Sequence, residues 1–239
     1  MPIAATRPQP GFGLRLDAKG LRLEAYSLRL AKTRAACFPC DTVWGTEMTG
    51  FGPLPPFKGL IFDCDGTLVI SAGLHLAAFD AALSRQGLVM EPQWYAARTG
   101  LARRDLLGAL QSALHPGLDL DRAIADSIAA TLGASAACRP NPPVVALARS
   151  WHGRVPMAVA SNAEGPVMRA MLDACDLTGL FNPLISLDDV SAPKPDPAMF
   201  LLAALRMELA PQDCLVLEDS DQGLSAAAAA GMAALDVRS

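Results

Sequence analysis

The stretch Gly59-Leu60-Ile61-Phe62-Asp63-Cys64-Asp65-Gly66-Thr67 decides the fold of this chain, because an apolar run ends there at a pair of carboxylates. A short apolar run of this kind is typical of a buried strand. In an open parallel sheet, ligands bind outside the carboxyl ends of the strands. Gly66 allows a sharp turn directly after the two acids. The stretch therefore predicts a strand that brings Asp63 and Asp65 to a site for a divalent cation and a reacting group.

The rest of the chain predicts an α/β fold with a helical insertion. We expect helices at 75–86, 104–114 and 121–132, followed by a Pro-rich linker at 139–143. From residue 144 onward helices and strands alternate, which is typical of a parallel, doubly wound sheet. The expected helices are 144–151, 167–175, 197–207 and 222–230, and the expected strands are 155–160, 184–187, 214–217 and 233–237. The prediction is a Rossmann-like core domain at 59–70 and 140–239, with an all-helical cap domain inserted at 71–139.

Residues 1–58 differ in composition from the rest of the chain. They are rich in Pro and Gly, and three of their eight basic residues are Lys, against one of twelve afterwards. We expect a disordered or loosely attached extension. An upstream translation artefact, with the true start near Met48 or at Leu54, is the other interpretation.

Composition and charge limit the classes of function. The net charge is −4, and residues 59–239 hold twelve basic against twenty acidic side chains, which argues against a nucleic-acid ligand. A phosphate ester remains possible, because a bound Mg²⁺ can invert the local field. The chain has neither an uncharged apolar run of roughly 18 residues nor a signal-peptide pattern. We therefore expect a cytoplasmic protein without a membrane partner, as a monomer or weak homodimer.

Polar residues follow the expected core strands. They are Asp63 after the first strand, Ser161-Asn162 after the second, Glu218-Asp219 after the fourth, and Lys194 just before a helix. The ends of parallel strands converge on one crevice. Carboxylates bind Mg²⁺, hydroxyl and N–H groups bind phosphate oxygens, and a lysine offsets the charge of a transferring phosphoryl group. A carboxylate can also be the nucleophile, so this set predicts phosphoryl transfer.

Four motifs resemble, in order, those of the haloacid dehalogenase (HAD) superfamily. They are Asp63-Cys64-Asp65-Gly66-Thr67, Ala160-Ser161-Asn162, Lys194-Pro195-Asp196-Pro197 and Leu217-Glu218-Asp219-Ser220. The resemblance covers residues 59–238 and is to the helical-cap subgroup that includes β-phosphoglucomutase. Ser150-Trp151-His152-Gly153-Arg154 and the terminal Leu235-Asp236-Val237-Arg238 look closest to bacterial fructose-1-phosphate and 6-phosphogluconate phosphatases.

The resemblance implies roles in catalysis and metal binding. Asp63 would attack phosphorus, and Lys194 would bridge Asp63 and phosphate. Asp65 would protonate the leaving sugar oxygen and then deprotonate the water that hydrolyses the aspartyl-phosphate. Mg²⁺ would be bound by the Asp63 side chain, the Asp65 carbonyl oxygen and Asp219. Glu218 would be a further ligand or a neighbour that orients one.

The resemblance also implies contacts with phosphate and substrate. They are made by Ser161, Asn162, Thr67, His75 and Arg103. For His75 the alternative is a helix cap, and for Arg103 and its neighbour Arg104 it is an exposed position at a helix start.

Three functions are compatible with these patterns. The first is a Mg²⁺-dependent phosphatase on small sugar phosphates, of the fructose-1-phosphate or 6-phosphogluconate type. The second is a β-phosphoglucomutase-like mutase, although the related caps use a basic pair that includes Lys and residues 70–140 contain none. The third is a catalytically inactive binding protein.

Overall fold

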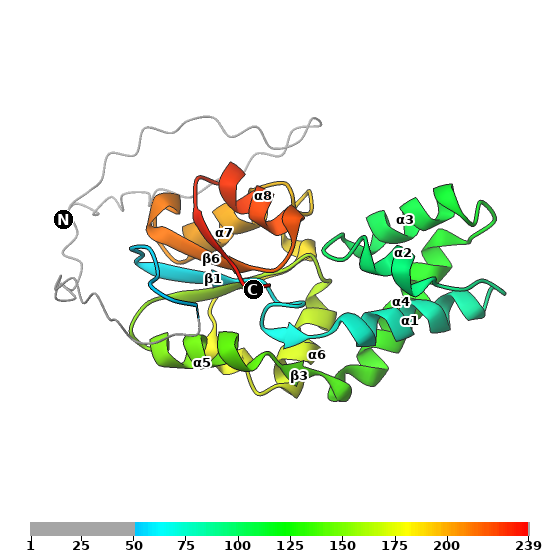
Figure 1. Cartoon of the computed structure of the whole chain (residues 1–239), viewed down its shortest axis with the longest axis horizontal. Helices are drawn as coiled ribbons and strands as arrows, with labels where there is room; N and C mark the ends of the chain where they lie inside the picture. The colour runs from blue at the N-terminus through cyan, green and yellow to red at the C-terminus, as the bar shows by residue number, and fades with distance from the viewer. Residues whose placement is uncertain (1–50, 239) are drawn as a thin grey trace, which may run out of the picture. The chain divides into compact units, whose positions relative to one another are not determined.

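A computed structural model describes residues 51–238, which contain a five-stranded parallel sheet (Figure 1). Strand β1 (Gly59–Phe62) lies at its centre, between β4 (Met157–Ala160) and β6 (Cys214–Glu218). Strands β5 (Leu184–Ile185) and β7 (Ala233–Asp236) form the edges, and every pairing in the sheet is parallel. The prediction of a doubly wound α/β fold is confirmed.

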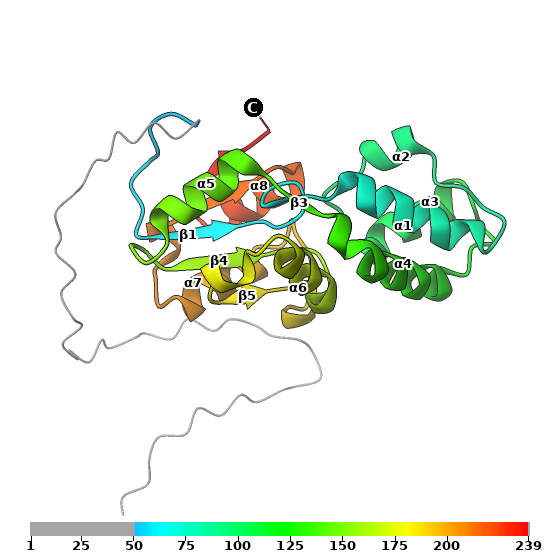
Figure 2. The same cartoon turned by 90° about the horizontal axis from the view of Figure 1, so that it is seen from below.

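Helices cover both faces of this sheet (Figures 1 and 2). Helices α5 (Pro142–Trp151) and α6 (Gly165–Ala174) pack with the face that carries Leu60 and Phe62. Helices α7 (Ala198–Arg206) and α8 (Asp221–Ala229) pack with the opposite face. Strand β1 is buried along its whole length, as expected for a central strand covered on both sides.

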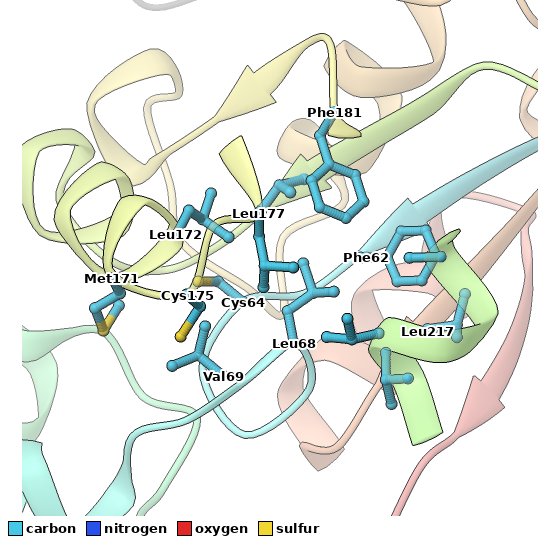
Figure 3. Close-up of a cluster of buried hydrophobic side chains, with 14 of the residues drawn as sticks. Phe62, Cys64, Leu68, Val69, Met171, Leu172, Cys175, Leu177, Phe181 and Leu217 are labelled. Atoms are coloured by element: carbon cyan, nitrogen blue, oxygen red, sulfur yellow. The ribbon is translucent and has the colours of Figure 1, made fainter. Parts of the chain in front are cut away.

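Apolar side chains anchor the loop that follows β1 (Figure 3). Cys64, Leu68 and Val69 are fully buried in the apolar cluster to which α6 also contributes. On the strand itself, the ring of Phe62 packs edge-on against Phe181, with a centroid distance of 5.3 Å. Truncating such a buried side chain typically costs about 2–5 kcal/mol of stability, so the apolar residues on either side of Asp65 fix the path of this loop.

The cap consists of helices with their own apolar cluster. They are α1 (Ala72–Ser84), α2 (Pro92–Ala96), α3 (Arg103–Ala113) and α4 (Leu120–Ala134). The cluster joins Phe79 and Leu83 of α1 to Leu107 and Leu110 of α3. Three of these helices match predicted ones, whereas α2 was missed because it is only five residues long.

A two-stranded antiparallel ribbon connects cap and core. Strand β2 (Val69–Ile70) pairs with β3 (Arg139–Pro140), which lies in the segment predicted as a linker. Short 3-10 helices complete the described part, at Ser135–Ala137, Thr178–Leu180, Leu187–Asp189 and Pro211–Asp213. Within residues 51–238, no helix is long and apolar enough to cross a membrane.

Part of the predicted extension contacts the core. Phe51, Leu54 and Phe57 pack against the apolar cluster to which α5 contributes, and the Phe57 ring lies edge-on to Trp151 at a centroid distance of 4.9 Å. Residues 1–50 lie outside the described residues, so their interpretation as an extension stays a prediction, as do the domain boundaries.

Candidate active site

The strand ends and the cap together line one cavity of about 220 Å³. It contains nearly all of the predicted site residues: Asp63, Asp65, His75, Arg103, Ser161, Asn162, Lys194, Glu218 and Asp219. The sheet register explains the convergence, because Phe62 pairs with both Val159 and Leu217. The residues that follow these three positions therefore emerge at the same edge of the sheet.

Lys194 joins two carboxylates on the core side of the cavity. Its Nζ donates hydrogen bonds to Asp63 Oδ1 at 2.6 Å and Glu218 Oε2 at 2.7 Å, and the residue is only 2% exposed. Burial alone would lower the pKa of Lys194, but the charges of Asp63 and Glu218 outweigh it and raise that pKa above its ordinary value. The ammonium group therefore stays charged at any physiological pH.

Glu218 has hydrogen bonds on both carboxylate oxygens. Besides the contact of Oε2 with Lys194, Oε1 accepts from the Asp219 N–H and from the N–H and hydroxyl of Ser220. A Cβ on Gly223 would overlap the Glu218 carboxylate, so only glycine fits beside it. Of the two alternatives for Glu218, these contacts support orientation of its neighbours.

Thr67 contacts Asp219 and is absent from the cavity lining. Its buried hydroxyl donates to Asp219 Oδ1 at 2.9 Å. Gly66 has a φ of +88°, and a Cβ there would overlap the Asp219 carboxylate. The structure thus gives Thr67 a contact that holds Asp219, and its predicted contact with phosphate stays a prediction.

The carboxylates on the core side fit a divalent cation. Oxygens of Asp63, Glu218 and Asp219 lie within 4.8 Å of one another. With Lys194 as their cation, these three carboxylates leave a local excess of two negative charges. Burial, followed by the charge of Glu218, raises the pKa of Asp63, and the same two causes raise that of Asp219 to about 6. An all-oxygen donor set with uncompensated negative charge is what Mg²⁺ prefers.

Asp65 occupies a different environment from Asp63. Its Oδ1 accepts a hydrogen bond from the Ser71 hydroxyl at 2.6 Å and lies 2.6 Å from His75 Nε2. Burial would raise the pKa of Asp65, but His75, Ser71 and the Arg103 charge together lower it. The two acids of the first motif therefore have pKa values shifted in opposite directions, as is common where two carboxyl groups have separate tasks.

Asn162 connects three segments around the cavity. Its Oδ1 accepts from the Lys194 backbone N–H at 2.9 Å, and its Nδ2 donates to the Gly100 carbonyl of the cap at 3.0 Å. The neighbouring Ser161 is buried, and its hydroxyl accepts from the Ala163 N–H. The Asn162 side chain thus fixes the backbone that carries Lys194.

Arg103 is buried, whereas Arg104 is exposed. Arg103 Nε donates to both carboxylate oxygens of Glu164, at 3.0 and 3.2 Å, and Nη1 donates to Ser127 at 3.1 Å. Arg104 pairs with Asp121 at the surface. The sequence left the choice between the two arginines open, and it gave no signal for Glu164 or for Ser71.

Comparisons with known proteins agree with this geometry. The family model of the haloacid dehalogenase-like hydrolases matches residues 57–231. The chain is 36% identical over 185 residues to the fructose-1-phosphate phosphatase YqaB of Escherichia coli, over 76% of this chain and 97% of that protein.

Solved structures of this family have the same fold. CbbY from Rhodobacter sphaeroides, in complex with phosphate, superposes with a TM-score of 0.68 at 23% identity, over 74% of this chain and 84% of that one. A HAD family hydrolase from Deinococcus radiodurans with bound phosphate and sodium gives a TM-score of 0.58 at 28% identity, over 75% and 80% of the two chains.

The chain belongs to the haloacid dehalogenase-like hydrolases. The resemblance found in its four motifs is confirmed, and so is the prediction of an enzyme of the HAD-like phosphatase type.

Proposed function

We propose that the protein is a Mg²⁺-dependent phosphatase that hydrolyses small sugar phosphates, of the fructose-1-phosphate or 6-phosphogluconate type. The observation that carries this proposal is the contact of Lys194 with Asp63 at 2.6 Å, beside the acidic cluster formed with Glu218 and Asp219. A buried carboxylate held next to a permanent cation and a cation site suits attack on phosphorus. The 36% identity to a fructose-1-phosphate phosphatase supports the substrate class.

Asp63 is the proposed nucleophile. Its carboxylate oxygen forms a bond to phosphorus, the bond from phosphorus to the sugar oxygen breaks, and an aspartyl-phosphate results. Lys194 contacts both Asp63 and the phosphoryl group and offsets the negative charge that gathers there. The Ser161 hydroxyl and the Asn162 N–H, at the end of β4, bind the phosphoryl oxygens.

Asp65 is the proposed acid and base. It gives a proton to the leaving sugar oxygen, and it then takes one from the water that attacks the aspartyl-phosphate. His75 lies within hydrogen-bond distance of Asp65 Oδ1, so its ring orients the carboxyl group.

Asp63, Asp219 and the Asp65 carbonyl oxygen would hold Mg²⁺, and Glu218 and Thr67 would orient them. When bound, Mg²⁺ supplies the positive charge that keeps the Asp63 carboxylate ionised and offsets the phosphoryl oxygens. The cytoplasmic location and the monomer or weak homodimer stay predictions from sequence.

The test is phosphate release from a panel of sugar phosphates, measured with Mg²⁺ and with a chelator. The proposal predicts release that requires the metal, with fructose-1-phosphate among the substrates. Conversion of glucose-1-phosphate to glucose-6-phosphate without phosphate release would contradict it in favour of a mutase.

A further inference from the structure

The ion pair of Arg103 and Glu164 lines the same cavity as Lys194 and joins the cap to the core. Arg103 begins α3 in the cap, and Glu164 immediately precedes α6 in the core. Both residues line the cavity, and their side chains are only 5% and 17% exposed. The bifurcated hydrogen bond from Arg103 Nε to both carboxylate oxygens of Glu164 therefore places a pair without net charge at the cavity wall, where we expect the part of the substrate beyond the phosphate.

The positive charges around this cavity are few. Among the described residues that line it, only Lys194 and Arg103 carry a permanent positive charge. Lys194 is engaged by Asp63 and Glu218, and Arg103 is engaged by Glu164 and Ser127. One phosphate group can bind near Lys194 and the proposed metal site. Among the described residues that line the cavity, no unpaired cation is left to bind a second anionic group.

From this arrangement, which rests on the proposed phosphatase function, we propose that the enzyme selects phosphate monoesters whose remaining part is uncharged, and that Glu164 sets this selection. An anionic tail would meet the largely buried Glu164 carboxylate, and like charges placed together cost several kcal/mol. A neutral polyol faces no such repulsion, because its hydroxyls can accept from Arg103 and donate to Glu164.

The other cap residues that line the cavity suit a small neutral tail as well. Phe79, Tyr95 and Leu106 form an apolar wall of the cavity, and the Phe79 ring centre lies 5.1 Å from the Arg103 guanidinium carbon. The same pairing argues against a mutase, because a mutase must bind a second phosphate in its cap. Glu164 thus separates sugar monophosphates with an uncharged tail from bisphosphates, phosphoglycolate and 6-phosphogluconate. Of the two substrate types in the proposed function, it favours the fructose-1-phosphate type over the 6-phosphogluconate type.

A matched pair of esters tests the proposal. Glucitol-6-phosphate and 6-phosphogluconate have the same carbon chain and differ in the end group, which is a hydroxymethyl in the first and a carboxylate in the second. For the wild-type enzyme with Mg²⁺, we expect kcat/KM to favour glucitol-6-phosphate by about tenfold or more. Glu164→Gln should narrow this ratio by about tenfold, through improved hydrolysis of 6-phosphogluconate, because it leaves Arg103 free to bind the carboxylate.

Three further variants keep the test decisive. Arg103→Gln should widen the ratio, because it leaves the Glu164 carboxylate without its cation; this variant also serves if Glu164→Gln does not fold. Glu164→Asp should preserve the wild-type preference, since the charge remains. Asp121→Asn is the matched control: it removes an exposed Arg–carboxylate pair elsewhere on the cap and should leave the ratio unchanged.

Equal hydrolysis of the two esters by the wild-type enzyme would overturn the inference while leaving the phosphatase function intact. So would a Glu164→Gln variant that folds and loses activity on both esters in parallel. Absence of Mg²⁺-dependent release from every ester on the panel would instead overturn the proposed function on which the inference rests.

Discussion

The two sides of the cavity are built differently. On the core side, Asp63, Lys194 and Glu218 are buried, and short hydrogen bonds and ion pairs hold each of them. On the cap side, apolar side chains surround a single Arg103–Glu164 pair. The core side therefore provides a fixed arrangement for phosphate chemistry, which the cap contacts through His75 at Asp65 and through the Gly100 carbonyl at Asn162. We therefore propose that the chemistry depends mainly on residues at the strand ends, and the choice of substrate on residues at the cap side.

The two sides also differ in how they are positioned. The core residues follow strands whose register is set by backbone hydrogen bonds, including the Asp63 N–H to the Leu217 carbonyl at 3.0 Å. The cap residues depend on packing within a separate helical cluster. Substitutions on the core side should therefore affect every substrate alike, and those on the cap side should affect substrates unequally.

The largest effect is expected for Lys194→Met. This change removes the cation between Asp63 and Glu218 and leaves two buried carboxylates without it. We expect kcat to fall by about 10³-fold on every ester, and the free energy of unfolding to fall by about 3–5 kcal/mol. Steady-state kinetics and urea denaturation measure the two quantities, and a loss of kcat below tenfold would contradict the role of Lys194.

The second-largest effect is expected for Asp219→Asn, because this change removes a proposed ligand of Mg²⁺. We expect the Mg²⁺ concentration for half-maximal activity to rise by about 10–100-fold, with partial recovery at high Mg²⁺. A variant that needs no more Mg²⁺ than the wild type would exclude Asp219 as a ligand. Asp221→Asn is a suitable control, because Asp221 pairs with Arg238 at the surface.

Asp219 also gives a pH dependence to the stability of the metal-free protein. Because folding raises its pKa to about 6, the folded state retains a proton that the unfolded state has already lost. The free energy of unfolding should therefore decrease by about 2 kcal/mol as pH rises from about 4 to about 6. Denaturation in chelator at several pH values measures this decrease, which Asp219→Asn should reduce. A stability that rises over this range in chelator would contradict the direction of the shift.

A smaller effect is expected for His75→Gln. The His75 ring is the largest influence that lowers the pKa of Asp65, so its removal should raise that pKa. Because an ionised Asp65 is needed to activate water, the acid limb of the pH–rate profile should move to higher pH, with a loss of kcat of about tenfold near pH 6. An unchanged acid limb would mean that His75 has only a structural role.

The smallest effect on activity is expected for Phe57→Ala. The Phe57 ring packs against Trp151 on the core, and neither residue lines the cavity. The free energy of unfolding should fall by about 2 kcal/mol, with kcat and KM unchanged. A change in substrate preference would show that the core surface beneath α5 influences the cavity.

The sequence was sufficient for the core side, because apolar runs that end in polar residues predict both the strands and their shared edge. It predicted that Asp63, Lys194, Glu218 and Asp219 would come together, and they do. Sequence patterns did not show that Arg103 is buried and Arg104 is exposed, because the burial of each arginine depends on contacts with other helices of the cap and core.

The partners of the predicted residues were also beyond sequence reasoning. Glu164 is 61 residues from Arg103, and nothing around it differs from an ordinary helix start. Ser71 immediately precedes α1, and its hydroxyl contacts Asp65 instead of capping that helix. The motif predicts a phosphate contact for Thr67, but it gives no sign that the Thr67 hydroxyl also contacts Asp219. Local patterns thus identify the charged groups, but the tertiary structure decides what each of them contacts.

The central claim is that Asp63 forms an aspartyl-phosphate, and chemical trapping tests it most directly. The enzyme would be mixed with fructose-1-phosphate and Mg²⁺, treated with borohydride to reduce an acyl phosphate to an alcohol, digested, and analysed by mass spectrometry. We predict substrate-dependent reduction at Asp63 alone, and no reduction in the Asp63→Asn variant. Turnover without reduction at Asp63, or reduction at Asp65 instead, would contradict the assignment.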